Sequence, residues 1–171
     1  MAAGDVDAVK RCMPVFQVLG ENIFNLGASG RGHAVKAFAN YVSAALLTAT
    51  MEGMLACKRF GVDPTLVLGV FNASPAYNSM TRKTIPEEVF TRKFATGFQI
   101  GYMVKDLRAA MEIAAEIGIP TPMGSLCLEL WAEAAKELGP HAEYAAYARY
   151  MEMQAGETIA PADKPAPVVS R

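Results

Sequence analysis

The sequence contains little cysteine and histidine, and it has no marked excess of charge of either sign. Among 171 residues there are three cysteines and two histidines, and 16 basic residues stand against 17 acidic ones. A near-neutral chain lacks the basic patch that nucleic acids and anionic membranes attract, so we expect neither as a partner. The basic residues at 82–93 are interleaved with Glu87 and Glu88, a pattern typical of a solvated surface.

The few cysteines and histidines exclude further classes of site. Cys12, Cys57 and Cys127 are odd in number, widely spaced and without a CxxC pair. This favours reduced thiols in a cytoplasmic protein over a disulfide framework or a zinc site. His33 and His141 are too scattered for a histidine-rich metal site, so we expect no metal. No apolar run reaches membrane-spanning length, and the N-terminus has no core of signal-peptide type.

What the sequence does contain is helical pattern over most of its length. Asp5 is expected to cap a first helix that reaches about Leu19, with Pro14 predicting a kink or an early end. From Gly32 to about Arg59 a proline-free run rich in Ala, Leu and Met predicts one helix of roughly seven turns. Further helices are expected over 64–73, 100–118, 122–138 and 140–153, with short helical turns and loop over 74–99.

These elements predict an all-α helical bundle built around one long buried helix. Apolar residues surround nearly the whole circumference of 32–59, as in a helix buried in a bundle or in a homodimer interface. NIFNLG at 22–27 indicates a short strand with nothing to pair with, a hint that an N-terminal part is missing. We expect a helix–strand piece over 1–28, an all-helical domain over 29–155 and a mobile tail over 156–171.

The segment GASGRGHAVKAFANY joins a glycine-rich turn to the long helix. It does not fit a nucleotide loop, because Gly27, Gly30 and Gly32 lack the G-x-G-x-x-G spacing and no second strand follows. A tight turn is the simpler interpretation. Lys36 and Asn40, however, are four residues apart and share a helix face among small and apolar side chains. Burial there, together with the helix N-terminus, would lower the pKa of the lysine toward the range useful for proton transfer.

Two motifs carry a resemblance to a known family. GASGRGHAVKAFAN resembles the G-x-x-G-x-G-x-x-x-K-x-x-x-N signature of the β-hydroxyacid dehydrogenases. This family includes 3-hydroxyisobutyrate, tartronate semialdehyde, glyoxylate and threonate-type enzymes, with 6-phosphogluconate dehydrogenase a more distant relative. GFQIGYMVKDLRAAMEIAAEIGIPTPM is similar to the family's G-F-x-x-x-x-x-x-K-D-x-x-x-A segment. The two motifs occur in the family's order and spacing, and the resemblance extends to about Met153.

The resemblance implies roles for five residues. Lys36 would be the general acid/base for the hydroxyl or carbonyl oxygen, while hydride passes between substrate carbon and the nicotinamide of NAD or NADP. Asn40 would bind substrate and help to position the lysine. Lys105 would approach the nicotinamide end of the cofactor, and Asp106 would support the site and its substrate. Phe98 would close over the substrate.

Other interpretations of these positions stay open on the residues alone. Lys105 and Asp106 suit an exposed ion pair on a helix, and Phe98 suits a core position. Ala39 stands where many family members have a second asparagine, which leaves the partner of the Asn40 amide less defined.

The resemblance also implies a missing part. The family's G-x-G-x-x-G and Ser-Gly-Gly turn do not occur here, and residues 1–28 resemble the last helix and strand of its Rossmann domain. We therefore expect the substrate-binding and proton-transfer domain of an NAD(P)-dependent dehydrogenase of 3-hydroxyisobutyrate-like or sugar acids, inactive alone. A non-catalytic helical dimerisation or binding module derived from that family is the alternative. The sequence does not distinguish the substrates or NAD from NADP.

Overall fold

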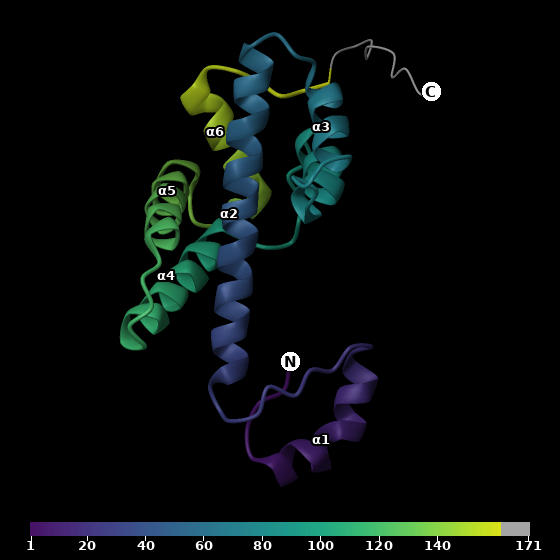
Figure 1. The fold of residues 1–171 in the computed structure, drawn as a ribbon, viewed down its shortest axis with the longest axis vertical. Helices are drawn as coiled ribbons and strands as arrows, with labels where there is room; N and C mark the ends of the chain where they lie inside the picture. Colours follow the sequence, from purple (N-terminus) through teal and green to yellow (C-terminus); the bar gives the residue numbers. More distant parts are fainter. Residues whose placement is uncertain (162–171) are drawn as a thin grey trace.

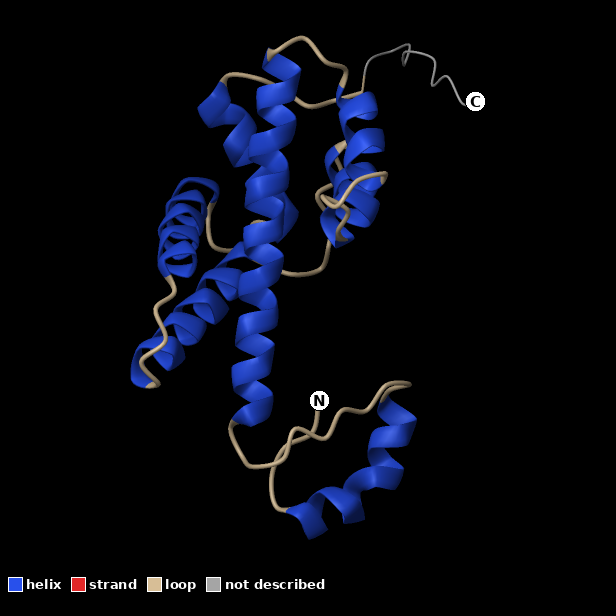
Figure 2. Ribbon diagram, viewed as in Figure 1, coloured by secondary structure: helices blue, strands red, loops and turns tan. Residues whose placement is uncertain are grey.

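The computed structural model describes residues 1–161, and helices dominate this part of the chain (Figure 2). In chain order they are α1 (Val6–Leu19), α2 (Arg31–Arg59), α3 (Pro64–Asn72), η1 (Met80–Val89), α4 (Ile100–Glu116), α5 (Pro122–Leu138), η2 (Tyr144–Ala146) and α6 (Tyr147–Ala155). The predicted all-α architecture is confirmed.

The long helix α2 organises the fold. The other helices of the bundle pack around its middle and its C-terminal part, while α1 lies past its N-terminal end and the first residues of the chain lie beside its first turns (Figure 1). Leu47, Met51 and Met54 on α2 are fully buried and form the centre of the core. Val35 and Val42, in contrast, are 44% and 52% exposed. The bundle thus covers the apolar side chains in the second half of α2, whereas some of those nearer its N-terminal end face solvent.

Two of the predicted helices begin at the aspartate that was expected to cap them. The Oδ1 of Asp5 accepts a hydrogen bond from the amide of Ala8, and the Oδ1 of Asp63 accepts one from the amide of Thr65. Pro14 lies inside α1 without ending it; Figure 1 shows the helix bent midway. A proline removes one backbone bond and crowds the preceding turn, which bends a helix whose other bonds persist.

The extended segment 22–27 is not unpaired, and that expectation was wrong. The amide of Ala2 donates to the carbonyl of Phe24, and the amide of Leu26 donates to the carbonyl of Ala2, both at 2.8 Å. Ala2 and Asn25 form a parallel bridge with α1 as the connection between the two segments. The first residues of the chain are too few to be recognised as a strand from their pattern.

Two other regions differ from the expectation. Residues 80–89, predicted as short helical turns and loop, form one continuous π-helix, η1, in which Ile85 and Val89 are fully buried. Burial of these apolar residues stabilises a helix that the proline-containing sequence does not predict. Pro140 does not start a helix; it lies in the turn before η2, and α6 begins only at Tyr147.

The folded part of the chain continues past the boundary expected at 155. Ile159 is fully buried, and its amide donates to Oε1 of Glu152 at 3.0 Å. One large apolar residue in a proline-rich stretch is enough to dock residues near it on the core. The rest of the predicted mobile tail, 162–171, lies outside the described residues.

Candidate functional site

The glycine turn places Lys36 and Asn40 on one face of α2. Gly27 and Gly30 have φ of +81° and +88°, a backbone conformation that is unfavourable for residues other than glycine. Gly30 directly precedes the first residue of α2, so the turn sets where the helix starts. Lys36 lies near this end and is exposed, whereas Asn40, one turn further on, is only 8% exposed.

A chain of polar contacts connects α2 with α4. The Nζ of Lys36 donates to Oδ1 of Asn40 at 2.7 Å, and Nδ2 of Asn40 donates to Oδ2 of Asp106 at 2.5 Å. The other carboxylate oxygen of Asp106 pairs with Nζ of Lys105 at 2.5 Å. An ammonium only donates and an ionised carboxylate only accepts, so the carboxamide of Asn40 fits in one orientation.

This cluster has an excess of positive charge. Lys105 pairs directly with the carboxylate of Asp106, whose side chain is 13% exposed, and Lys36 is linked to that carboxylate only through Asn40. The Lys105 side chain is 69% exposed, so the ion pair with Asp106 that the sequence left open does form, with its ammonium facing solvent. The nearby N-terminus of α2 adds a partial positive charge. The arrangement favours a small anion such as a carboxylate.

Phe98 faces this cluster from the segment before α4. The Nζ of Lys36 lies 6.0 Å from the centroid of its ring. The ring also packs at 6.0 Å against Tyr102 and edge-on at 6.2 Å against Tyr144. Phe98 is half-buried, and it therefore combines the packing role and the site-facing role that the sequence left open.

The five predicted site residues thus lie together, but one expectation about them was wrong. Lys36 is exposed in this chain and not desolvated by its neighbours. The apolar side chain of Val35 also faces solvent, because it lies on the part of α2 that the bundle leaves uncovered. Lys36 instead borders a hollow of about 370 Å³, which is lined by Met1, Ala3, Ser29, Gly30, Gly32, His33 and Lys36.

Glu143 contacts the segment that carries Phe98, and sequence reasoning missed it. Its Oε2 accepts hydrogen bonds from Oγ1 of Thr96 at 2.8 Å and from the amides of Gly97 at 2.7 Å and Phe98 at 3.2 Å. The bond from Thr96, with those from the two amides, lowers the pKa of Glu143 below its usual 4.5, although partial burial opposes the shift. No local pattern indicates a contact between residues so far apart in sequence.

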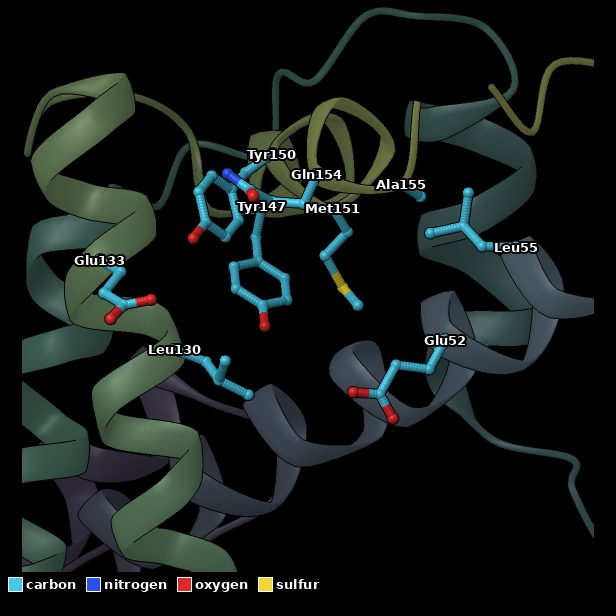
Figure 3. A pocket seen from close by; sticks show the side chains of 9 residues that line it. All are labelled: Glu52, Leu55, Leu130, Glu133, Tyr147, Tyr150, Met151, Gln154 and Ala155. Atoms are coloured by element: carbon cyan, nitrogen blue, oxygen red, sulfur yellow. The ribbon is translucent and has the colours of Figure 1, made fainter. Parts of the chain in front are cut away.

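A second hollow, of about 480 Å³, lies between α2, α5 and α6 (Figure 3). Glu52 and Glu133 approach it from opposite sides, and the rings of Tyr147 and Tyr150 lie between them. It includes none of the five predicted site residues. The hollow of about 480 Å³ and the cluster of predicted site residues are therefore two separate places in the fold.

Two structural findings limit the remaining possibilities. None of the helices within residues 1–161 is long and apolar enough to cross a membrane. In the same part of the chain, no three His, Cys, Asp or Glu side chains come together in a way that could hold a metal ion.

The sequence matches a family model described as the NAD-binding region of NADP-dependent 3-hydroxyisobutyrate dehydrogenase, over residues 30–151. It is 31% identical over 137 residues to an NAD-dependent L-serine dehydrogenase of Pseudomonas aeruginosa, covering 77% of this chain and 46% of that protein. It is 28% identical over 160 residues to the 2-hydroxy-3-oxopropionate reductase of Escherichia coli K12, covering 94% and 54% of the two chains.

A solved structure has the same fold. The 3-hydroxyisobutyrate dehydrogenase of Mycobacterium tuberculosis, determined with L-serine, superposes with a TM-score of 0.78 at 25% identity, over 87% of this chain and 53% of that one. The chain spans about half the length of the curated relatives it matches, and the matches fall on their C-terminal half.

Proposed function

This chain belongs to the NADP-dependent 3-hydroxyisobutyrate dehydrogenase family, and we propose that it is the substrate-binding and proton-transfer domain of an NAD(P)-dependent 3-hydroxyacid dehydrogenase. The observation that carries the proposal is the contact between Lys36 and Asn40, which fixes an ammonium group at the edge of a hollow. The contact continues to Asp106 on a second helix, so the proton donor is held by two packed elements.

Lys36 has the right chemistry to move the proton. Its ammonium carries three hydrogens, and the one donated to Asn40 leaves two for a substrate oxygen. When a carbonyl is reduced, Lys36 gives a proton to the oxygen that becomes the hydroxyl; in the reverse direction it takes that proton back. NAD or NADP supplies the hydride acceptor or donor when bound.

The positive charge of the cluster suits the carboxylate of a hydroxyacid. The two ammonium groups stand against one carboxylate, that of Asp106, which pairs with Lys105 and is linked to Lys36 through Asn40. A substrate carboxylate near the α2 N-terminus gains charge-assisted hydrogen bonds there. Substrates of interest are 3-hydroxyisobutyrate, L-serine and sugar acids, since relatives are named for the first two kinds.

The described residues fit only one end of a nicotinamide cofactor. The exposed ammonium of Lys105 and the ring of Phe98 border the site from the α4 side and suit the nicotinamide end. The glycine turn at 27–32 lacks the spacing of a phosphate loop. We therefore propose that a separate nucleotide-binding domain holds most of the cofactor and that this chain has no turnover alone.

The N-terminal piece supports such a partner domain. Residues 1–4 and 24–27 pair in parallel across α1, an arrangement found in sheets whose faces are covered. Val18, Leu19 and Phe24 in this piece are 86%, 78% and 61% exposed. Burying these side chains against a nucleotide-binding domain would remove a large apolar surface from water.

A non-catalytic assembly module derived from the family is the second candidate. It is favoured by Val35 and Val42, which are exposed on one face of α2 and would suit a homodimer interface. With either function, we propose a cytoplasmic location, as expected from the three free cysteines without a CxxC pair. The two candidate functions differ in one respect: the first requires Lys36 for catalysis, and the second does not.

The test joins this chain to the nucleotide-binding half of a family member and follows NAD(P)H absorbance with hydroxyacid substrates. Lys36→Ala is expected to lower kcat by roughly 10²- to 10⁴-fold, the usual contribution of a general acid/base. Lys83→Ala, which removes an exposed lysine on η1, is the matched control and should leave kcat unchanged. Near-normal kcat in Lys36→Ala, or turnover by the isolated chain, would contradict the proposal.

A further inference from the structure

We propose that Glu143 is a positioning residue that holds the segment 96–98 so that the ring of Phe98 stays over Lys36. Its catalytic consequence rests on the function proposed above, whereas its effect on the position of Phe98 does not. Glu143 lies between α5 and η2, outside both sequence motifs. It would act on the reaction only through Phe98.

The segment that carries Phe98 has no regular secondary structure over 93–98, and Glu88 and Glu152 hold only its first part, through Ala95 and Arg92. It connects η1 to α4 and includes three residues with left-handed backbone, since Arg92, Phe94 and Gly97 have φ of +61°, +47° and +75°. Such conformations persist where surrounding contacts hold them. The contacts that could hold residues 96–98 therefore decide where the ring lies.

Glu143 supplies several of these contacts from a single oxygen. Its Oε2 accepts from the hydroxyl of Thr96 and from the amides of Gly97 and Phe98, at 2.7 to 3.2 Å. Two adjacent amides and a hydroxyl that converge on one carboxylate oxygen are charge-assisted donors, and these are stronger than neutral hydrogen bonds. Their directions leave the backbone at 97–98 little freedom to rotate.

Backbone pairing continues the attachment on both sides of the carboxylate. The amide of Tyr144 donates to the carbonyl of Phe98 at 2.7 Å, and the amide of Ile100 donates to the carbonyl of Ala142 at 2.7 Å. Gln99 and Glu143 form an antiparallel bridge between these bonds. Residues 142–144 thus pair through their backbone with residues 98–100, which lead into α4. The side chain of Glu143 extends this attachment to residues 96–98.

The ring of Phe98 transfers this constraint to the site. It lies edge-on to Tyr144, the neighbour of Glu143, and its centroid is 6.0 Å from Nζ of Lys36. A ring in this place borders one side of the space around the ammonium, where a substrate would lie against it. If the segment loosens, substrate binding weakens, while Lys36 keeps its bond to Asn40 and hence its proton-transfer geometry.

The first experiment needs no activity and uses the full 171-residue chain. Amide hydrogen exchange of Gly97 and Phe98 is measured by NMR at pH 7 in the wild type, Glu143→Ala and Glu143→Gln. Loss of the charge-assisted bonds should speed exchange of both amides roughly ten- to one-hundredfold in Glu143→Ala, with a smaller effect in Glu143→Gln, which keeps an oxygen acceptor. The Lys36 Cε methylene resonance should shift, because the ring current of Phe98 moves away from it.

The matched control is Glu129→Ala, which removes an exposed carboxylate from α5. It should leave exchange at 97–98 and the Lys36 resonance unchanged. Unchanged exchange and an unchanged Lys36 resonance in a folded Glu143→Ala or Glu143→Gln chain would overturn the proposal. Because Glu143→Gln changes only a charge and one donor, it keeps the test decisive if the alanine variant does not fold.

The second experiment uses the chain joined to a nucleotide-binding domain. Glu143→Gln should raise KM for the hydroxyacid about tenfold with kcat within about twofold, equivalent to the loss of one charged hydrogen bond. In a Phe98→Ala background the same substitution should have no further effect on KM. Two results would contradict the positioning role. One is a roughly tenfold fall in kcat with KM unchanged. The other is a roughly tenfold rise in KM on Glu143→Gln in the Phe98→Ala background as well.

The two experiments separate the two proposals. If the joined enzyme has no turnover while exchange at 97–98 responds to Glu143→Gln, the proposed function fails and the structural role of Glu143 stands. If turnover depends on Lys36 while exchange does not respond, the function stands and the role of Glu143 fails.

Discussion

Asn40 and Asp106, 66 positions apart in the sequence, are joined by a 2.5 Å hydrogen bond from the carboxamide Nδ2 to the carboxylate Oδ2. Asn40 is 8% exposed, so its amide has little access to water as an alternative partner. The same amide accepts from Lys36 through Oδ1. The bond therefore fixes α2 against α4 and determines which amide atom faces the lysine.

The first prediction concerns the removal of this carboxylate. Asp106→Ala leaves the buried Nδ2 of Asn40 without an acceptor, which should lower the free energy of unfolding by about 1–3 kcal/mol. Urea unfolding of the chain measures it. Asp106→Asn keeps an oxygen acceptor and should lose less. Glu112→Ala, which removes an exposed carboxylate from the same helix, is the control and should lie within about 0.5 kcal/mol of the wild type. Equal urea midpoints for Asp106→Ala and Glu112→Ala would show that the bond contributes nothing.

The second prediction concerns the buried core around the single tryptophan. Trp131 is fully buried, stacks on Tyr147 with centroids 4.1 Å apart and donates from Nε1 to Oγ1 of Thr48 at 3.1 Å. Thr48→Val keeps the shape of the side chain but leaves the indole N–H without an acceptor. The free energy of unfolding should therefore fall by about 1–3 kcal/mol. The fluorescence of Trp131, the only tryptophan in the chain, reports the transition directly.

Ser43→Ala is the matched control for this change. The Ser43 hydroxyl donates to the carbonyl of Ala39 just as the Thr48 hydroxyl donates to that of Ala44, so both variants lose one bond within α2. Only Thr48→Val also deprives the indole of its acceptor. If the two variants had the same midpoint, the bond from Trp131 would have no measurable effect on stability.

The sequence predicted those features that depend on a few neighbouring residues. Asp5 and Asp63 start helices because a capping side chain bonds to an amide two or three positions on, and Gly30 precedes α2 because the turn needs positive φ. The i, i+4 spacing placed Lys36 and Asn40 on one face, and their contact is present. Such predictions need no knowledge of the rest of the fold.

The features that were missed depend on which distant segments pack together. The exposure of Lys36 could not be predicted, because apolar neighbours on a helix do not say which face the bundle covers. Ala2 pairs with the segment at 22–27 although its own residues give no strand pattern. The contact of Glu143 with Thr96 joins positions 47 apart, and no spacing rule connects them.

The third prediction concerns the start of α4. A Cβ on Gly101 would lie 2.8 Å from the carbonyl oxygen of Pro140, and that oxygen accepts the amide of Gly101 at 3.0 Å. Because the obstacle is backbone, Gly101→Ala forces the 140–144 segment to move and should destabilise the chain by about 1–3 kcal/mol. Thermal unfolding followed by circular dichroism measures the change.

Gly69→Ala provides the opposite case. Gly69 lies inside α3, and nothing lies within 4 Å of the Cβ position. Alanine in a helix interior is favoured over glycine by roughly 0.5–1 kcal/mol, so this variant should be more stable than the wild type. Unchanged stability of Gly101→Ala would contradict the packing described at Gly101, and destabilisation by Gly69→Ala would contradict the open space described at Gly69.

The last prediction is a loss of stability at alkaline pH. Burial raises the pKa of the Cys127 thiol from 9.0 to about 11 and that of the Tyr147 phenol from 10.0 to about 12. Both groups are neutral in the folded chain and ionise more easily once unfolded. Their contribution to stability is therefore complete below pH 9, begins to fall as pH rises through the unfolded values, and is lost as pH passes the folded ones.

Urea unfolding at a series of pH values from 8 to about 11 tests this, with Cys127→Ala as the informative variant. It should be less stable than the wild type at pH 8, because it loses buried packing, yet should lose stability more slowly between pH 9 and 11. Cys12→Ala, which removes an exposed thiol from α1, should leave the pH dependence as in the wild type. Parallel curves for wild type and Cys127→Ala would mean that the Cys127 thiol ionises as readily in the folded chain as in the unfolded one.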